Sequence, residues 1–596
     1  MSDSYLMAVA TKMDLIVRRS AQLMISYTTD PEFREDLLTD PLGLGSTYAY
    51  AWQRAAQSLP ALYTHQIDLF NRCWQLQRYA GERLLGMKPE PVTESRNGDR
   101  RFSAEDWHNV LYFDLLSQAY LLAAESIINC TEELTDGDGE MGQKLRFHAQ
   151  QAVDALAPSN SAIANPQVVA ETLNTGGLNL LHGLASLLYD LLRGKGQLAI
   201  SMTDPRPFQL GQNIASTPGK VVYQNEMMQL LQFEPTTTEV CKRPLLIVPP
   251  WINKYYILDL RQENSFIRWA VDQGYTLFVI SWVNPDETHA DKGFDDYLQQ
   301  GVVAAIDAVE QATGEPQVDA IGYCLGGTLL SCANGYFAAL KQNRFASSSY
   351  FTTLIDFDEV GDLGVFIDEE QLASLEKRML EKGYLDGANM AMTFSMLRAN
   401  DLVWPFFTNN YLLGKDPVAF DLLFWNADNT RMPAAMHSFY LRNMYQANRL
   451  REPGGITLSG VPIDLRQVTT PSYFVSTIDD HIAPWVSTFS GAQLFGGPVK
   501  FVLGGSGHIA GIINPPSANK YSYWTGGAPR GSADEWLKQA KHQPGSWWND
   551  WQRWMRKRNG VQVPARIPGD GALPIIEEAP GSYVAVRGNQ QAPWHA

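Results

Sequence analysis

Gly322-Tyr323-Cys324-Leu325-Gly326-Gly327-Thr328 is the stretch of this 596-residue sequence that says most about its fold. The residues before it, VDAI from Val318, belong to a short run that is typical of a buried strand. The residues after it, LLSCANGYFAAL, favour a helix. Glycines flank the cysteine because side chains at those positions would clash in a direct strand-to-helix turn. The sequence therefore predicts that Cys324 lies on a strained turn between a strand and a helix.

This turn has the form Gly-x-nucleophile-x-Gly, the nucleophile elbow of the α/β-hydrolase fold, with cysteine in place of serine. A helix that begins just after Cys324 favours its thiolate and places the Leu325 amide where it can donate to an oxyanion. The motif alone is a weak signal, since glycine turns beside buried cysteines are common. Cys332, within the following helix, is expected to pack rather than react. Cys324 is therefore the candidate nucleophile.

Runs of strand length on both sides of this turn predict a parallel β-sheet. Each run is continuous, rich in β-branched or aromatic residues and bounded by proline or glycine. The runs begin at Arg243, Tyr275, Val318, Tyr350, Ser472 and Pro498. Helical stretches such as Phe294–Gly314 lie between several of them. Strands alternating with helices indicate an α/β fold whose sheet is covered on both faces.

The chain is expected to form two domains. Residues 1–205 lack strand-like runs and place apolar residues at helical spacing, which predicts an all-helical N-terminal domain. Residues 206–596 hold the α/β domain. Within it, about 115 residues separate the strand ending near Ile355 from the next one, which is too long for a simple crossover. Residues 357–470 are therefore expected to be a cap or lid, whose aromatic side chains either form its own core or line an apolar substrate tunnel.

A nucleophile elbow requires a histidine base after the last strand. His508 follows the run from Pro498 and lies in a flexible Gly-Ser-Gly approach, so it is the candidate base. His481 follows the run from Ser472 and is expected to pack or hydrogen-bond beside the base.

The sequence pattern does not decide which carboxylate orients this base. Asp356, Asp479 and Asp480 all follow strand-like runs. Adjacent residues near a strand end face opposite ways, so only one of Asp479 and Asp480 can reach the imidazole.

Five segments, in order along the chain, resemble the polyhydroxyalkanoate synthases. They are PPWINKYYILDL from Pro249, GYCLGGT from Gly322, FDLLFWN from Phe420, DDHIAPW from Asp479 and GSGHIAGIINPP from Gly505. The elbow looks like the class I form, and the resemblance runs from about Phe102 to the C-terminal region. It implies an α/β-hydrolase fold with a cysteine nucleophile.

Carried over residue by residue, the resemblance makes Cys324 the acyl-bearing nucleophile, His508 the general base and Asp480 its acid. Trp425 matches a family tryptophan near the catalytic centre and is expected to position substrate, together with His481.

The oxyanion is expected to lie between two backbone amides. The segment after Pro249-Pro250 takes the place where α/β-hydrolases supply the second donor, so the Ile252 amide is expected to join that of Leu325.

The resemblance also implies the reaction: an acyltransferase that polymerises (R)-3-hydroxyacyl-coenzyme A, of the short 3-hydroxybutyryl type, with release of coenzyme A. A thiolate exchanging one thioester for another is nearly isoenergetic and suits such a reaction. Coenzyme A enters as part of the substrate, and neither a cofactor nor a metal is expected. A thioesterase or depolymerase on the same fold is the alternative, although it would favour serine and a wetter site. A non-catalytic granule scaffold is the other rival.

The amino-acid composition limits the classes of binding partner and the cellular compartment that are expected. The net charge is -17 and no Lys/Arg block occurs, which argues against nucleic acid. Five cysteines without CxxC spacing predict reduced thiols in a reducing compartment and no zinc site. The N-terminus is a poor signal peptide and no apolar run is long enough to span a membrane, so a cytoplasmic protein is expected.

The resemblance implies a homodimer on polyester granules, and amphipathic N-terminal helices are suited either to pairing subunits or to binding a granule-coating protein. Near the C-terminus, Trp547, Trp548, Trp551 and Trp554 have helical spacing. They are expected either to pack against the α/β domain or to contact polymer.

Overall fold

The computed structural model describes residues 3–29, 44–95, 98–135 and 139–587. This part of the chain forms two compact units. The helical unit contains the described residues up to Asp204 together with Met392–Val418, and the sheet unit contains Pro205–Ala391 and the described residues from Ala419 onward. The segment expected to form one cap, residues 357–470, is thus divided between the two units.

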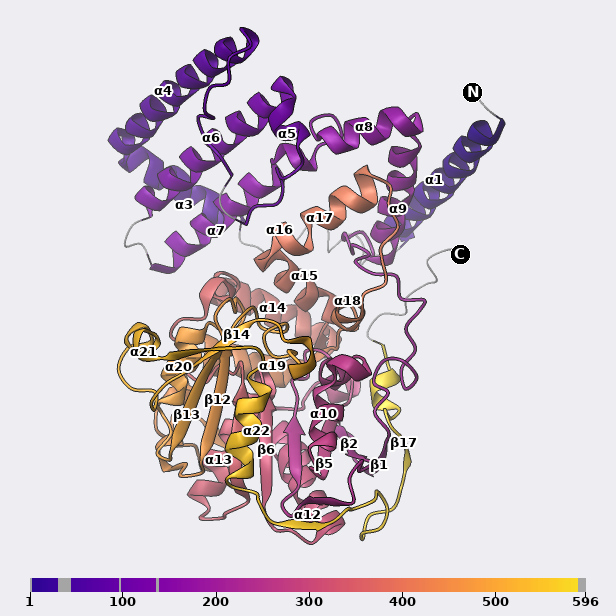
Figure 1. The fold of residues 1–596 in the computed structure, drawn as a ribbon, viewed down its shortest axis with the longest axis vertical. Helices are drawn as coiled ribbons and strands as arrows, with labels where there is room; N and C mark the ends of the chain where they lie inside the picture. Colours follow the sequence, from indigo (N-terminus) through magenta and orange to yellow (C-terminus); the bar gives the residue numbers. More distant parts are fainter. Residues whose placement is uncertain (1–2, 30–43, 96–97, 136–138, 588–596) are drawn as a thin grey trace. The chain divides into compact units, whose positions relative to one another are not determined.

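The helical unit has the predicted all-α character (Figure 1). Its helices before Asp204 are α1 (Asp3–Thr29), α3 (Leu44–Gln57), α4 (Leu59–Leu84), α5 (Asp106–Asn109), α6 (Leu111–Leu134), α7 (Gly139–Ala155), α8 (Pro166–Thr175) and α9 (Leu178–Arg193). Local sequence sets their ends, as α8 illustrates. The Asn165 side chain caps its first amides, Pro166 occupies its first turn, and Gly176 ends it with a φ of 63°.

Close backbone contact explains why Met392–Val418 belongs to the helical unit. A Cβ on Gly183 of α9 would lie 1.8 Å from the carbonyl oxygen of Tyr411, so only glycine permits this approach. The Tyr411 hydroxyl donates to the buried carboxylate of Asp190 at 2.5 Å, and the Asn179 amide donates to the Leu412 carbonyl at 2.8 Å. These contacts were not visible in the sequence pattern.

The sheet unit contains an 11-stranded sheet in the order β15-β14-β13-β12-β7-β6-β4-β5-β2-β1-β17. The six strands from β13 to β5 run parallel to one another, whereas the strands added at both edges pair antiparallel. Their bounds are β1 (Gly219–Gln224), β2 (Met228–Phe233), β4 (Leu245–Val248), β5 (Leu277–Trp282), β6 (Val318–Tyr323), β7 (Phe345–Phe351), β12 (Ser472–Thr477), β13 (Val499–Gly504), β14 (Ser522–Thr525), β15 (Lys541–Pro544) and β17 (Glu577–Glu578).

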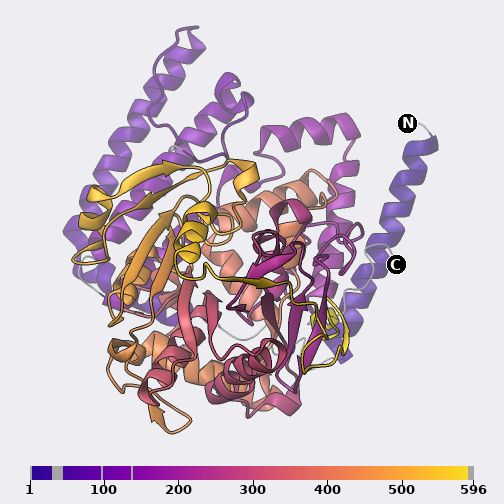
Figure 2. The ribbon, with the colours of Figure 1, turned by 60° about the horizontal axis from the view of Figure 1, so that its bottom comes forward.

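Helices cover both faces of this sheet, as predicted. Figure 1 shows α10 (Phe266–Asp272) and α22 (Trp548–Arg556) on one face, and α12 (Ala304–Thr313), α13 (Leu325–Ala339) and α20 (Trp485–Ala492) on the other. Figure 2 shows the strands lying between these two layers. Alternate residues of β4 enter different hydrophobic clusters, Leu246 on one side and Leu245 on the other. The α/β-hydrolase architecture predicted from the sequence is therefore confirmed.

One predicted strand was misplaced. The run beginning at Tyr350 was expected to be a strand, but β7 covers Phe345–Phe351 and the chain leaves the sheet after Phe351. Residues 347–349 in the middle of the strand are all serines, which an apolar pattern does not detect. They are buried because they have partners: Ser347 donates to Asp319 at 2.6 Å, and Ser349 accepts from the Trp551 indole at 2.9 Å.

The C-terminal tryptophans form part of the core. Trp547, Trp548 and Trp551 are at most 1% exposed and Trp554 is 7% exposed. The packing interpretation is therefore confirmed, and contact of these side chains with polymer is excluded by their burial. Among the described residues, no helix has both the length and the apolar character needed to cross a membrane.

Candidate active site

The predicted elbow lies between β6 and α13. Cys324 has φ 51° and ψ -124°, a strained conformation for a residue with a side chain. The Cys324 amide donates to the Phe351 carbonyl at 2.9 Å, and the Cys324 carbonyl accepts from the amides of Gly327 and Thr328. The backbone on both sides is thus fixed by hydrogen bonds, and the thiol is held at the start of the helix.

The glycines of the motif permit close backbone contacts on both sides of Cys324. A Cβ on Gly322 would lie 2.4 Å from the Cα of Gly327, and one on Gly326 would lie 2.2 Å from the carbonyl oxygen of Val248. The second contact places the end of β4, and hence the segment after Pro249, against the first turn of α13. This is the segment in which the second oxyanion donor is expected.

Replacing Gly326 with alanine should damage both stability and activity. The new methyl group forces β4 and α13 apart, which should cost about 1–3 kcal/mol in unfolding free energy. Displacing the expected oxyanion donor should lower turnover roughly a hundredfold. Gly293→Ala is the control, since its Cβ would meet nothing closer than 3.9 Å. Urea unfolding and coenzyme A release measure the two effects, and equal behaviour of the two variants would contradict this account.

His508 and Asp480 form a buried pair. The Nδ1 of His508 lies 2.7 Å from the Oδ2 of Asp480, and the Asp480 side chain is fully buried. The other carboxylate oxygen accepts from the amides of Ile482 and Ala483 at 2.9 and 2.8 Å. With Nδ1 directed at Asp480, the Nε2 of His508 is left for Cys324, and the two side chains interact electrostatically. The residues predicted to be nucleophile, base and acid therefore lie in that order.

Charge in this site favours a protonated imidazole. Burial lowers the pKa of His508, but the negative charges of Asp480 and Cys324 and hydrogen bonds to both outweigh burial and raise that pKa to about 10. The raised pKa leaves an imidazolium beside Cys324 near neutral pH.

The raised pKa of His508 predicts a pH-dependent contribution to stability. A histidine with a folded-state pKa above its unfolded value stabilises fully below about pH 6.5 and loses this effect as pH rises to about 10. The difference in unfolding free energy between the wild type and His508→Gln should thus shrink as pH rises to about 10.

His437→Gln is the matched control for this measurement. Burial lowers the pKa of His437 to about 4. The contribution of His437 to the free energy of unfolding should therefore fall as pH decreases from about 6.5 to 4, and it should stay constant above pH 6.5. If the difference in unfolding free energy between the wild type and His508→Gln stayed constant from pH 6.5 to 10, the charged pair of His508 and Asp480 would be contradicted.

The other two candidate acids lie in different environments. The Asp479 side chain is exposed, although its amide donates to the Ser506 carbonyl at 3.0 Å. The Asp356 carboxylate is buried, but it accepts from the Asn448 amide at 2.7 Å and from Arg451 at 3.2 Å. Of the three candidate aspartates, only Asp480 therefore lies next to His508.

The predicted oxyanion and positioning residues belong to the start of α13, the loop after β4, helix α18 (Asp421–Asn426) and the segment after β12. Leu325 is the first residue of α13, where an amide has no partner within the helix. The Ile252 carbonyl accepts from the Thr430 amide at 3.2 Å, which fixes its loop, and the use of its amide stays a prediction. Trp425 is 5% exposed, and its indole donates to the Lys254 carbonyl at 2.7 Å. His481 is half-buried beside Asp480, and its role stays a prediction.

Two tyrosines interact with this site; the sequence pattern pointed to Tyr440 only as one aromatic residue of the expected cap and did not single out Tyr445. Tyr440 and Tyr445 both interact electrostatically with Cys324. They come from the expected cap, but five residues apart on an α-helix they would face in different directions. No spacing rule for α-helices would have paired them.

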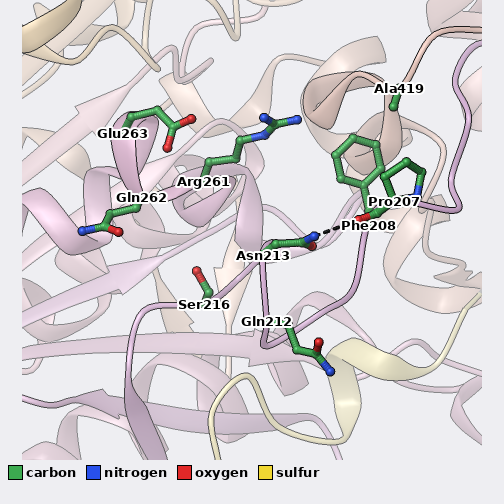
Figure 3. Close-up of a pocket in the computed structure, with 9 residues that line it drawn as sticks. All are labelled: Pro207, Phe208, Gln212, Asn213, Ser216, Arg261, Gln262, Glu263 and Ala419. Atoms are coloured by element: carbon green, nitrogen blue, oxygen red, sulfur yellow. Dashed lines mark hydrogen bonds between the residues drawn. The ribbon is translucent and has the colours of Figure 1, made fainter.

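A separate pocket of about 450 Å³ lies in the sheet unit (Figure 3). Its lining residues are Pro207, Phe208, Gln212, Asn213, Ser216, Arg261, Gln262, Glu263 and Ala419. Arg261 lies 5.6 Å over the Phe208 ring and 3.1 Å from the carboxylate of Asp421. Its charge is therefore already balanced, and the pocket lacks the excess positive charge that would attract the phosphates of coenzyme A.

Comparisons with known proteins identify the family to which the chain belongs. A family model described as Poly-beta-hydroxybutyrate polymerase (PhaC) N-terminus matches residues 98–270, and one described as alpha/beta hydrolase fold matches residues 243–515. The chain is 50% identical to the poly(3-hydroxyalkanoate) polymerase subunit PhaC of Rhizobium meliloti, over 88% of this chain and 85% of that protein. It is 41% identical to the subunit PhaC of Cupriavidus necator, over 82% and 83%. The chain therefore belongs to the poly(3-hydroxyalkanoate) polymerases, acyltransferases built on the α/β-hydrolase fold.

Proposed function

We propose that this polymerase joins short (R)-3-hydroxyacyl groups, of the 3-hydroxybutyryl type, through a covalent thioester on Cys324. The observation that carries the proposal is the buried His508–Asp480 pair, 2.7 Å apart, beside a cysteine at a strained elbow. In this proposal Cys324 is the nucleophile, His508 the base and Asp480 the acid that orients it. The preference for short acyl groups rests on the class I resemblance of the elbow.

The cycle begins with an imidazolium on His508 and a thiolate on Cys324. The thiolate attacks the carbonyl carbon of the coenzyme A thioester, and the amides of Leu325 and Ile252 stabilise the resulting oxyanion. Coenzyme A leaves as a thiol after taking the proton from His508. Neutral His508, with Nδ1–H held by Asp480, is then ready to act as a base.

The next step extends the polyester. His508 accepts the proton of the 3-hydroxyl of an incoming substrate, whose oxygen attacks the acyl carbon on Cys324. The carbon–sulfur bond breaks, Cys324 leaves as a thiolate, and the imidazolium–thiolate pair is restored. Transfer of the longer chain back to Cys324 releases coenzyme A and completes the cycle.

A polymerase must keep water from the acyl-enzyme, and the surroundings of Cys324 support this requirement. Cys324 is only partly exposed and packs against both hydrophobic clusters of the sheet unit. Phe357 and Tyr440, 2% and 6% exposed, belong to one of these clusters. Such an apolar environment favours transfer to a hydroxyl over hydrolysis.

The proposal includes a homodimer that acts on polyester granules in the cytoplasm, with a granule-coating protein as a further partner. One surface of the helical unit suits such contacts. Tyr63, Ile67, Phe70 and Trp74 are between 47% and 71% exposed and follow a 4-3-4 spacing, so they form one apolar stripe along α4.

The test is to incubate the purified protein with 3-hydroxybutyryl-coenzyme A and to measure both free thiol and insoluble polyester. Thiol release with polyester is the expected result. Thiol release with free 3-hydroxybutyrate alone would instead indicate a thioesterase. No thiol release would contradict the proposed activity.

A further inference from the structure

A π-helix pairs two tyrosines beside the elbow. Helix α19 (Ala434–Tyr440) continues directly into the π-helix η8 (Leu441–Gln446). In an α-helix, five residues turn through about 500°, which would leave Tyr440 and Tyr445 about 140° apart. A π-helix bonds residue i to i+5 and so places residues five apart on one face. The ring centroids of Tyr440 and Tyr445 are accordingly 5.3 Å apart, with the rings nearly perpendicular.

The surroundings hold this pair in place. Phe357 makes edge contacts with both rings, at centroid distances of 6.0 and 4.9 Å, and Phe294 stacks on Tyr440. The segment after η8 is clamped at Asn448, which has φ 44° and donates from its side chain to Asp356 at 2.7 Å. The pair is therefore fixed to the chain that follows β7, directly beside the elbow.

Both tyrosines interact with the proposed catalytic residues. Tyr440 interacts electrostatically with Cys324, and it packs in the hydrophobic cluster against which Cys324 lies. Tyr445 is half-buried and interacts electrostatically with both Cys324 and Asp480.

Both phenols keep their protons in this site. Burial is the main cause that raises the pKa of each. A protonated phenol has one hydrogen to donate, so Tyr445 can donate it to a group bound in the site.

We propose that Tyr445 is a further catalytic residue, whose phenol donates a hydrogen bond to the 3-hydroxyl oxygen of the incoming substrate and directs its proton toward His508. Tyr440 is a positioning residue that acts through Tyr445. The inference rests on the proposed polymerase cycle and concerns its second step. In that step the hydroxyl proton passes to His508, the new ester bond forms, the bond to Cys324 breaks, and Tyr445 keeps its own proton.

Two substrates separate this role from the acylation step. Butyryl-coenzyme A lacks the 3-hydroxyl, so it acylates Cys324 and releases a single burst of coenzyme A. 3-Hydroxybutyryl-coenzyme A supports continued turnover. Tyr445→Phe should leave the burst rate within about twofold of wild type and lower continued turnover at saturating substrate roughly tenfold, the effect of losing one hydrogen bond in the transition state.

Matched variants exclude a general structural effect. Tyr350→Phe removes another buried phenol, which accepts from Asn334 at 3.0 Å, and should change neither rate. Tyr440→Phe should slow continued turnover less than Tyr445→Phe, and the double variant should be no slower than Tyr445→Phe alone, because both act through one hydrogen bond.

Three results would overturn the inference: an equal loss of burst and turnover in Tyr445→Phe, no loss of either, or additive effects of the two tyrosines. The absence of any burst in the wild type would instead contradict the acyl-enzyme on which the inference rests. Failure of the inference and failure of the proposed function are thus distinguishable.

Discussion

Cys324→Ala is expected to lower turnover of 3-hydroxybutyryl-coenzyme A by at least about 10⁴-fold, because no thioester can then form on the protein. The fold should survive, since the elbow is held by backbone hydrogen bonds from Cys324 to Phe351 and Gly327 that alanine retains. Coenzyme A release measures the loss of turnover. Incorporation of labelled acyl groups into denatured protein measures the loss of the thioester. Circular dichroism and the unfolding midpoint show that the fold is intact.

Cys332→Ala is the matched control for this variant. Cys332 lies in α13, the helix that follows Cys324, eight residues further along the chain, and is fully buried. Burial raises the pKa of its thiol to about 12, so it is not a thiolate at neutral pH. Its replacement should cost about 1 kcal/mol of stability through lost packing and leave turnover within about twofold. Turnover that persists in Cys324→Ala and disappears in Cys332→Ala would reassign the nucleophile.

Sequence alone located the elbow because its requirements are local. The Gly-x-Cys-x-Gly pattern encodes a turn in which Gly322 and Gly326 permit backbone contacts that any Cβ would prevent. The order of strands, acid and histidine follows from the same fold. The N-terminal helices were likewise predictable from their periodicity.

Features that depend on tertiary partners were not predictable in the same way. The residues left Asp479 and Asp480 equivalent, and only the path of the chain after β12 exposes one and buries the other. The serines of β7 look unlike a buried strand until their partners on other elements are known. Met392–Val418 joins the helical unit through Gly183, a contact far away in the sequence. The π-helix that pairs Tyr440 with Tyr445 breaks the period on which helix patterns rely.

Asp480→Asn is expected to lower turnover by about 10³–10⁴-fold, even though the side chain keeps its size. The carboxylate accepts from the Nδ1 of His508 and from the amides of Ile482 and Ala483. An asparagine that keeps its oxygen toward the two amides turns its NH₂ group toward His508. Nδ1 must then accept, the proton moves to Nε2, and the imidazole no longer accepts a proton from Cys324 or from a hydroxyl.

Asp479→Asn provides the comparison that isolates this effect. It makes the same chemical change at the neighbouring residue, whose side chain is exposed, so turnover should stay within about twofold of wild type. Asp480→Asn should also remove the main attraction that raises the pKa of His508, and its unfolding free energy should therefore lose the dependence on pH between about 6.5 and 10. A larger loss of turnover in Asp479→Asn would reassign the acid. An unchanged pH dependence in Asp480→Asn would instead show that the charge of Cys324 alone maintains the imidazolium, because those two negative charges are what oppose burial at His508.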